Sequence, residues 1–362
     1  MPKINPEIEA FARIKVVGVG GSGRNAVNHM VRSKVTGVEF IVANTDAQDL
    51  HNSLAGKKIH IGKNLTRGLG TGMNPELGRR AAEETKEEIQ ESLKGADMVF
   101  ITSGMGGGTG TGASPIVAKT ARELNALTIG VVTKPFFFEG TQRMHLSELG
   151  LEALEAEVDA LIIIPNDKLL NNSKDTTMLS AFAQADEVLR QAVEGISDLI
   201  TTPGYINVDF ADIKAVMANA GTALMGIGVA SGENRAVDAA RMAINSPLLD
   251  VSINGARGVL FAIAGGEDMT MNEIQEAARV ITESVDVNAK IIFGAIPDLK
   301  VRKGEIKVTV IASGFPEAGR TKMKKIRDDR AEERKVGIEP MQEESDEDED
   351  DDEEDEEEKK KN

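Results

Sequence analysis

Apolar runs alternate with amphipathic stretches along most of the chain. Short runs rich in β-branched residues predict strands, and the first five lie at 14–17, 40–43, 97–102, 128–133 and 160–165. The stretches between them carry apolar residues at helical spacing, as in Ala26, Val27, Met30 and Val31. This βαβ rhythm predicts an α/β fold in which helices cover a mostly parallel sheet.

A longer amphipathic pattern runs from Thr177 to about Ile200 and ends at the sequence TTPG, 201–204. We interpret it as a central helix that leaves the first domain. Further strand-like runs follow at 223–230, 259–264, 290–295 and 306–312, with helical patterns at 235–244 and 272–285. These elements predict a second, smaller α/β domain that ends near Phe315.

Residues 104–112 read GMGGGTGTG, with six glycines in nine positions. The apolar run 98–101 precedes this segment, and we expect the following helix to carry Pro115 in its first turn. Glycine lets backbone N–H groups approach an anion closely, and the hydroxyls of Thr109 and Thr111 add further donors. The segment therefore predicts a phosphate-binding loop, and tight packing is the less favoured alternative.

A first glycine-rich segment, GVGGSGRN at 18–25, lies between a predicted strand and a predicted helix. It matches the GxGxxG pattern, which leaves open a Rossmann oxidoreductase with Asp46 as the ribose-binding acid. The second loop and the scattering of only four histidines count against a dehydrogenase. Because no GxxxxGK[ST] motif occurs, we expect backbone amides of both loops to hold one polyphosphate.

The carboxyl ends of parallel strands meet at one edge of a sheet, where ligands bind in folds of this class. Both glycine loops follow predicted strands, and so do the segments 44–46, 134–135 and 165–167. We therefore expect all five segments to lie along the same edge.

The composition of the 362 residues, 41% of them apolar, changes this picture little. The chain shows no apolar run long enough to cross a bilayer and no signal-peptide pattern, so we expect a cytoplasmic protein without direct membrane insertion. The absence of cysteine excludes disulfides, thiolate metal sites and cysteine nucleophiles.

The net charge of −17 is concentrated at the C-terminus. Residues 343–358 hold 15 acidic residues, and with the three lysines that follow, the segment 343–362 accounts for −12 of the net charge. A block of like charges cannot fold by burying apolar surface, so we expect a disordered tail, preceded by a charged linker at 320–335. Nothing in the remaining chain predicts nucleic-acid binding.

Six ordered motifs between Arg13 and Phe315 resemble the FtsZ family, the prokaryotic cell-division GTPases related to tubulin. They are GGGTGTG at 106–112, NTDAQ at 44–48, GLGTGMNPELG at 68–78, KPFFFEG at 134–140, IPNDKLL at 164–170 and NVDFADIKAVM at 207–217. The resemblance implies a Rossmann-like GTPase domain with a parallel sheet, a long central helix and a smaller α/β C-terminal activation domain. It also implies head-to-tail polymerisation into filaments of a cell-division ring.

This resemblance and the patterns above give five expected segments. They are an N-terminal extension at 1–12, a GTP-binding domain at 13–176, a central helix at 177–204, a C-terminal domain at 205–316, and a disordered linker and acidic tail at 317–362.

The resemblance also implies the residues that bind GTP or GDP. Glycine-loop and γ-phosphate-loop residues would surround the phosphates, Glu139 would bind the ribose, and Arg143 would lie at the sugar and phosphate. A surface pair is the alternative for Glu139 and Arg143. The full phosphate and sugar set is Gly20, Gly21, Ser22, Gly23, Arg24, Asn25, Asn44, Thr71, Gly72, Met73, Gly106, Gly107, Gly108, Thr109, Gly110, Thr111, Glu139 and Arg143.

Three further residues would recognise the base. A carboxylate that accepts from guanine N1–H and the 2-amino group disfavours adenine, and the resemblance gives this role to Asp186 together with Asn166. Phe182 lies one helical turn before Asp186 and would stack on the base. Without the family motifs, we would assign Phe182 to the core.

The segment 207–212 places two carboxylates three residues apart at a helix start. Asp209 fits an ordinary N-cap, but the family resemblance directs both acids at the γ-phosphate of a neighbouring subunit. Asp212 would then polarise the attacking water, with Asp209 and Asn207 assisting, and Mg²⁺ carried by the nucleotide would offset the charge. We expect no metal held directly by the protein.

The chain departs from the family at two places. Arg24 stands where glycine or asparagine is usual, and its side chain either strengthens nucleotide binding or points to solvent. The sequence ends in acids and KKKN, whereas the family commonly ends in an apolar and basic peptide that binds membrane-tethering proteins. The identity of any tethering partner at the division site is therefore an open question. A nucleotide-gated filament with little hydrolysis is the other alternative to a polymerising GTPase.

Overall fold

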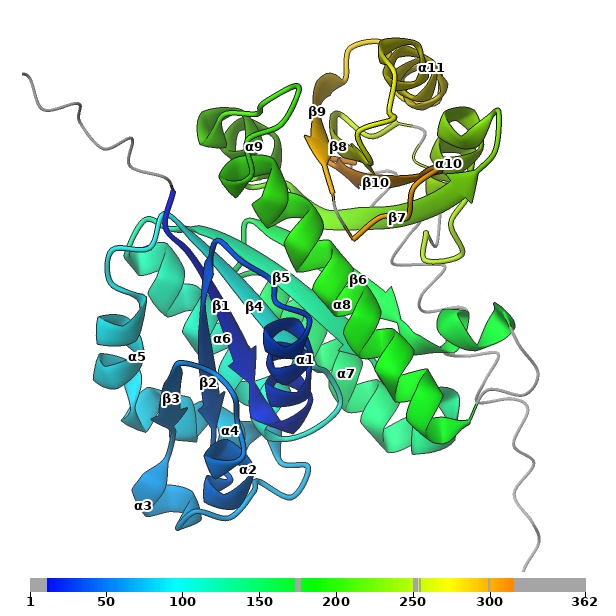
Figure 1. Ribbon diagram of the computed structural model, residues 1–362. Coiled ribbons are helices and arrows are strands. Elements are labelled where there is room, and N and C mark those ends of the chain that lie inside the picture. Colours follow the sequence, from blue (N-terminus) through cyan, green and yellow to red (C-terminus); the bar gives the residue numbers. More distant parts are fainter. Residues whose placement is uncertain (1–11, 173–176, 250–252, 254, 299, 316–362) are drawn as a thin grey trace, which may run out of the picture. The chain divides into compact units, whose positions relative to one another are not determined.

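The structure is a computed structural model, and it describes residues 12–315 apart from 173–176, 250–252, 254 and 299. The expected N-terminal extension, linker and acidic tail lie outside the described residues, except for position 12. Figure 1 gives the element labels.

Six parallel strands form the first part of the sheet, in the order β3-β2-β1-β4-β5-β6. This arrangement confirms the predicted α/β class with a mostly parallel sheet. The bounds are β1 (Ile14–Val19), β2 (Val38–Asn44), β3 (Lys57–His60), β4 (Met98–Gly104), β5 (Leu127–Lys134) and β6 (Ala160–Pro165). The sequence patterns above did not include β3, which has only four residues.

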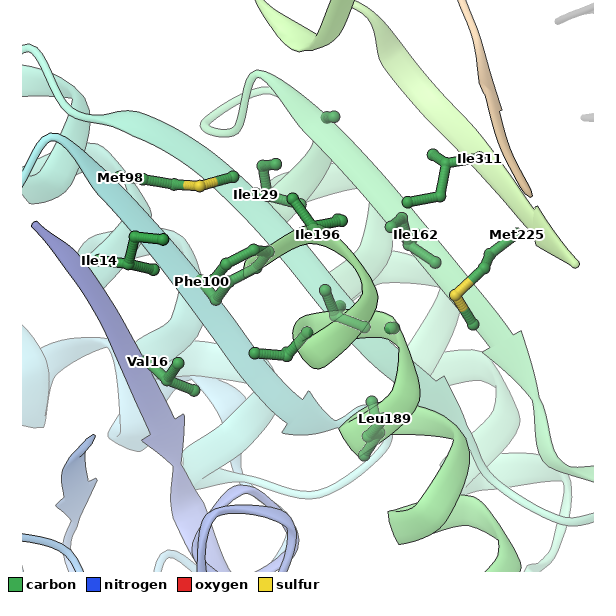
Figure 2. Close-up of a cluster of buried hydrophobic side chains, with 14 of the residues drawn as sticks. Ile14, Val16, Met98, Phe100, Ile129, Ile162, Leu189, Ile196, Met225 and Ile311 are labelled. Atoms are coloured by element: carbon green, nitrogen blue, oxygen red, sulfur yellow. The ribbon is translucent and has the colours of Figure 1, made fainter. Parts of the chain in front are cut away.

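Both faces of this sheet are buried, which explains why its strands are continuous apolar runs. Along β4, Met98 and Phe100 belong to one core, while Val99 and Ile101 belong to another. Figure 2 shows the first of these cores, where Leu189 and Ile196 lie against side chains of the neighbouring strands.

Helices cover the two faces. The face with Phe100 is covered by α1 (Gly20–Arg32) and α8 (Met178–Thr201), and α8 is the predicted central helix. The opposite face is covered by α4 (Pro75–Glu84), α5 (Lys86–Leu93), α6 (Thr109–Glu123) and α7 (Thr141–Glu155). Shorter elements complete this half: α2 (Ala47–His51), α3 (Lys63–Thr66), η1 (Phe137–Glu139) and η2 (Asn166–Asn172).

The second half contains strands β7 (Gly221–Ser231), β8 (Gly258–Gly265), β9 (Lys290–Pro297) and β10 (Glu305–Ser313), and helices α9 (Phe210–Met217), α10 (Arg235–Ile244) and α11 (Met271–Thr282). Strand β7 pairs in parallel with β6 over three residues and antiparallel with β10 over eight. The sheet therefore continues from one half into the other, with the order β7-β10-β8-β9.

One local expectation was wrong. Pro115 was expected in the first turn of its helix, but α6 already begins at Thr109, and Pro115 lies inside it. The helix can start this early because its first residues include Gly110 and Gly112, which pack closely against other backbone segments. Inside the helix, Pro115 cannot donate a hydrogen bond to the carbonyl one turn earlier, and its ring crowds that carbonyl.

A group of charged side chains joins α8 to the second half of the chain. Glu194 of α8 is buried and pairs with Arg190 on its own helix and with the Lys300 ammonium, 2.6 Å away. Asp198 lies one turn further along α8. Burial is the main cause that raises the pKa of Asp198 to about 7, with a smaller increase from the charge of Glu194, while Lys307 and Lys300 oppose the increase.

This raised pKa predicts a pH dependence of stability. Between pH about 4 and pH about 7, the folded state binds more protons at Asp198 than the unfolded state, so this residue lowers the free energy of unfolding as pH rises. Asp198→Asn removes the titration. We therefore expect the difference in melting temperature, variant minus unmodified protein, to increase from pH 5 to pH 8. Gln275→Ala, at an exposed and uncharged position of α11, should show a constant difference, and a constant difference for Asp198→Asn would contradict the assignment.

The packing of α6 against α4 predicts unequal effects of alanine at two glycines. A Cβ on Gly112 would lie 1.9 Å from the Pro75 carbonyl oxygen, whereas a Cβ on Gly107 would meet no heavy atom within 4 Å. Overpacking of this kind costs about 1–3 kcal/mol. Thermal unfolding should show a clear loss of stability for Gly112→Ala and almost none for Gly107→Ala, and equal melting temperatures would contradict this packing.

Candidate functional site

The two glycine-rich loops follow neighbouring parallel strands and lie against each other. Helix α1 begins directly after β1, at Gly20, whose φ of +72° favours glycine. A Cβ on Gly20 would lie only 2.9 Å from the Gly110 nitrogen, and one on Gly104 would lie 2.7 Å from the Ser22 hydroxyl oxygen. The structure thus brings together the two loops that the sequence predicted to hold one polyphosphate.

The two loops differ in how open they are. Gly21, Ser22 and Asn25 are exposed in the first two turns of α1, while Gly23 is buried against the Thr102 carbonyl. In the second loop, Gly106, Gly108 and Gly110 are buried, and Gly107 is partly exposed. The Thr111 hydroxyl is occupied within this loop, because it accepts a hydrogen bond from the Gly106 N–H at 2.9 Å.

A third loop, which contains Thr71, contacts the second glycine-rich loop through threonine hydroxyls. Thr109 in the second loop contacts the hydroxyls of Thr45 and Thr71 at 2.8 and 3.1 Å, and all three residues are buried. The next residues turn outward, since Gly72 is exposed and both Gly72 and Met73 have positive φ. The loop is therefore anchored at Thr71, with its following residues beside the glycine loops.

Glu139 and Arg143 form an ion pair, which was the alternative to nucleotide binding that their spacing left open. The Arg143 Nη1 to Glu139 Oε2 distance is 2.7 Å, and the other Glu139 oxygen accepts from the Phe136 N–H at 2.9 Å. The main chain of Arg143 also contacts the second glycine loop, because a Cβ on Gly106 would lie 2.6 Å from its carbonyl oxygen. This contact fixes the start of α7 next to the loop.

The three predicted base-recognition residues come from η2 and α8. Asn166 is 4% exposed, and its Oδ1 has no hydrogen-bond partner among the described residues. Phe182 is 41% exposed, so it is not a core residue, and its ring meets Phe136 edge to face at 5.2 Å. Burial raises the pKa of Asp186 to about 6, while the positive charges of His29 and Arg24 oppose that increase.

The Arg24 side chain does not extend into solvent, since it is 21% exposed and pairs with another side chain. Its guanidinium pairs with Asp49, whose other carboxylate oxygen accepts from Asn44 Nδ2 at 2.7 Å. The sequence analysis missed Asp49, although it lies on the first turn of α2, which Asp46 caps by accepting from the Asp49 N–H at 2.9 Å. Asp46 thus serves as a helix cap, the ordinary use of such a residue.

The three predicted catalytic residues lie elsewhere. Asp209 is the N-cap of α9 and accepts from the Ala211 N–H at 3.0 Å, and Asn207 accepts from the Gly204 N–H at 2.7 Å. Asp212 is exposed in the first turn of α9. They follow the end of the 24-residue α8, which is about 36 Å long, whereas Phe182 and Asp186 lie near its start. In Figure 1, α9 lies near one end of α8, away from α1 and α2.

This arrangement suits a ligand that carries a phosphate anion at one end and an aromatic or heterocyclic base at the other. The exposed first turn of α1 and the adjacent start of α6 favour phosphate, because the N-terminus of a helix attracts anions. Unpaired Asn166 Oδ1 and the Asp186 carboxylate supply acceptors for a base. The described residues hold no group of three His, Cys, Asp or Glu side chains arranged for a metal ion. Within the same part of the chain, no helix combines the length and apolar character that a bilayer crossing requires.

Comparisons with known proteins agree with this arrangement. The family described as Tubulin/FtsZ family, GTPase domain, matches residues 13–174, and FtsZ family, C-terminal domain, matches 221–316. A structure of an empty FtsZ dimer from M. jannaschii is 48% identical, with a TM-score of 0.81, and the match covers 84% of this chain and 88% of that one. A tryptophan-to-tyrosine mutant of M. jannaschii FtsZ is 47% identical, with a TM-score of 0.82 and coverage of 84% and 92%.

A GTPγS-bound protofilament of CetZ2 from Haloferax volcanii shares the fold at 21% identity, with a TM-score of 0.74 and coverage of 90% and 99%. The family matches, the identity to the M. jannaschii structures and the two joined glycine loops lead to one conclusion. The chain belongs to the FtsZ family and contains its tubulin-type GTPase domain.

Proposed function

We propose that the chain binds GTP at the joined glycine loops, assembles head to tail into filaments and hydrolyses GTP only at the contact between two subunits. The observation that carries this proposal is the separation of the predicted site into two parts. The binding residues gather at the carboxyl ends of the parallel strands, and the acids of α9 lie beyond the far end of α8.

The phosphates would lie over the first turns of α1 and α6. Gly21, Ser22 and Asn25 are exposed on α1, and Gly107 leaves open space beside the second loop. The partial positive charge at the starts of these two helices favours a polyphosphate. The third loop, anchored at Thr71, would reach the γ-phosphate with Gly72 and Met73 and relax when that phosphate leaves.

The base would lie between Phe182 and the acceptors of Asn166 and Asp186. An unpaired buried oxygen is costly unless a ligand or water satisfies it, and guanine presents the donors that Asp186 requires. Glu139 would bind the ribose hydroxyls with Arg143 beside the sugar and phosphate.

Hydrolysis would need the neighbouring subunit. Asp212 is exposed at a helix start, and its carboxylate has no hydrogen bond or ion pair among the described residues, so it is available to polarise a water for in-line attack. Asp209 and Asn207 would hold the turn that presents it, through the hydrogen bonds described above. Mg²⁺ would be brought by the triphosphate and would offset the charge between phosphate and carboxylate.

Self-association has support from a relative, because one M. jannaschii FtsZ structure is described as a dimer. We further propose that the filaments serve cell division in the cytoplasm at the division site.

The catalytic assignment is tested by Asp212→Ala. Because Asp212 is exposed and remote from the binding residues, we expect GTP and GDP affinities within about twofold of the unmodified protein. Turnover should fall by about 10²-fold or more, the usual effect of losing a group that activates water. Equilibrium titration and phosphate release measure the two quantities.

Asp238→Ala is the matched control, since Asp238 is also a first-turn aspartate, on α10. It should leave binding and turnover unchanged. Normal turnover in Asp212→Ala, or loss of nucleotide binding in a folded variant, would refute the role given to Asp212.

The raised pKa of Asp186 predicts how nucleotide affinity depends on pH. Guanine requires the ionised carboxylate, so affinity for GDP should fall as pH drops below about 6, approaching tenfold per unit. Asp186→Asn should bind GDP weakly at every pH and show only the titration of the phosphate itself. Parallel pH profiles for the two proteins would contradict base recognition by Asp186.

A further inference from the structure

The pairing of Arg24 with Asp49 places two opposite charges at the edge of the predicted phosphate site. Arg24 lies on the second turn of α1 and Asp49 on α2, and their side chains are 21% and 20% exposed. A Cβ on Gly21, in the first turn of α1, would lie 3.7 Å from Asp49 Oδ2. A carboxylate is therefore adjacent to the helix start where the phosphates are expected.

A bare carboxylate at this position would repel a polyphosphate. In the structure, Arg24 neutralises it through one oxygen, and Asn44 donates to the other. Asn44 Oδ1 in turn accepts from the Thr45 N–H at 2.9 Å. The pair is thus connected to the backbone that follows β2, which is itself part of the predicted nucleotide site.

The guanidinium keeps unused donors. Arg24 Nε is buried and has no hydrogen-bond partner among the described residues, and within that part of the chain the side chain bonds only from Nη2 to Asp49. An arginine fork offers five N–H donors and matches phosphate oxygens well. A buried donor without a partner calls for a ligand or a water.

The position of Arg24 also fits a nucleotide that spans both ends of the site. Its charge acts on Asp49, beside the first turn of α1, and also on Asp186 at the base end, whose pKa it lowers against the effect of burial. The guanidinium therefore pairs with a group at the phosphate end and exerts its charge on a group expected to meet the base.

We propose that Arg24 is a nucleotide-retaining residue, which neutralises Asp49 and donates its free N–H groups to a phosphate oxygen of the bound guanosine diphosphate. Asp49 is then the competing anion that weakens this hold. The inference rests on the proposed function, because it concerns the same nucleotide site. It adds a charge-based control of nucleotide release to a site otherwise built from backbone amides.

The test measures GDP binding and release in the full-length chain, with no GTP present, so that turnover plays no part. Release of a fluorescent GDP analogue is followed after mixing with excess GDP, and the dissociation constant is measured by titration. Arg24→Ala should raise both the release rate and the dissociation constant by about tenfold, the usual weight of a hydrogen bond to a charged group. Arg32→Ala, at the other end of α1, is the matched control and should change neither.

The Asp49 variants distinguish the proposed role of Arg24 from a purely structural one. The two roles predict opposite changes in the rate of GDP release. Asp49→Asn removes the competing anion and should slow release, and Arg24→Ala/Asp49→Asn should release GDP more slowly than Arg24→Ala alone. If Asp49→Asn instead speeds release and the double variant is no better than Arg24→Ala, the pair only holds the loop, and the proposal is wrong.

Guanosine without phosphate separates phosphate contact from base contact. The Arg24→Ala effect should be present for GDP and absent for guanosine, and an equal effect on both would overturn the phosphate contact. If Arg24→Ala matches Arg32→Ala in every measurement, Arg24 has no role in retention. If the unmodified chain binds no guanine nucleotide, the proposed function itself fails, which is a different result from any of these.

Discussion

The burial of the parallel sheet on both faces is the constraint on which the rest of the structure depends. Alternating residues of a strand, such as Phe100 and Ile101, are buried in two different cores on opposite faces of the sheet. The strands therefore cannot shift in register without exposing apolar side chains to water. The loops at their carboxyl ends are therefore held at fixed relative positions. At this edge Gly20 and Gly110, from distant parts of the sequence, come into contact with each other.

Much of this edge could be predicted from the sequence, because glycine clusters after apolar runs have a direct physical meaning. The two glycine loops were expected there from the residues themselves, whereas Thr71, Asn166 and Phe182 were assigned through the family resemblance, and the motifs identified the family correctly. Other features depend on packing that no local pattern reveals. The helix after the second loop starts six residues before Pro115, because Gly112 allows the close approach of α4. Asp49 became a candidate site residue only through its pairing with Arg24.

The joining of the two halves was also beyond sequence reasoning. Patterns of apolar residues predicted a second α/β domain but gave no pairing between its strands and the first sheet, whereas β7 pairs with strands on both sides. The charged group of Glu194, Lys300 and Asp198 adds a second link between α8 and the following half. Through these links the long helix α8 separates the nucleotide site from the acids of α9 by a fixed distance. Under the proposed function, a site divided in this way would be complete only when two copies of the chain meet.

The dependence of GTPase rate on protein concentration tests this account most directly. If each nucleotide is cut by the acids of a neighbouring subunit, the rate per subunit should be close to zero in dilute solution and should rise steeply once filaments form. A rate per subunit that stays constant at every dilution would contradict the shared site.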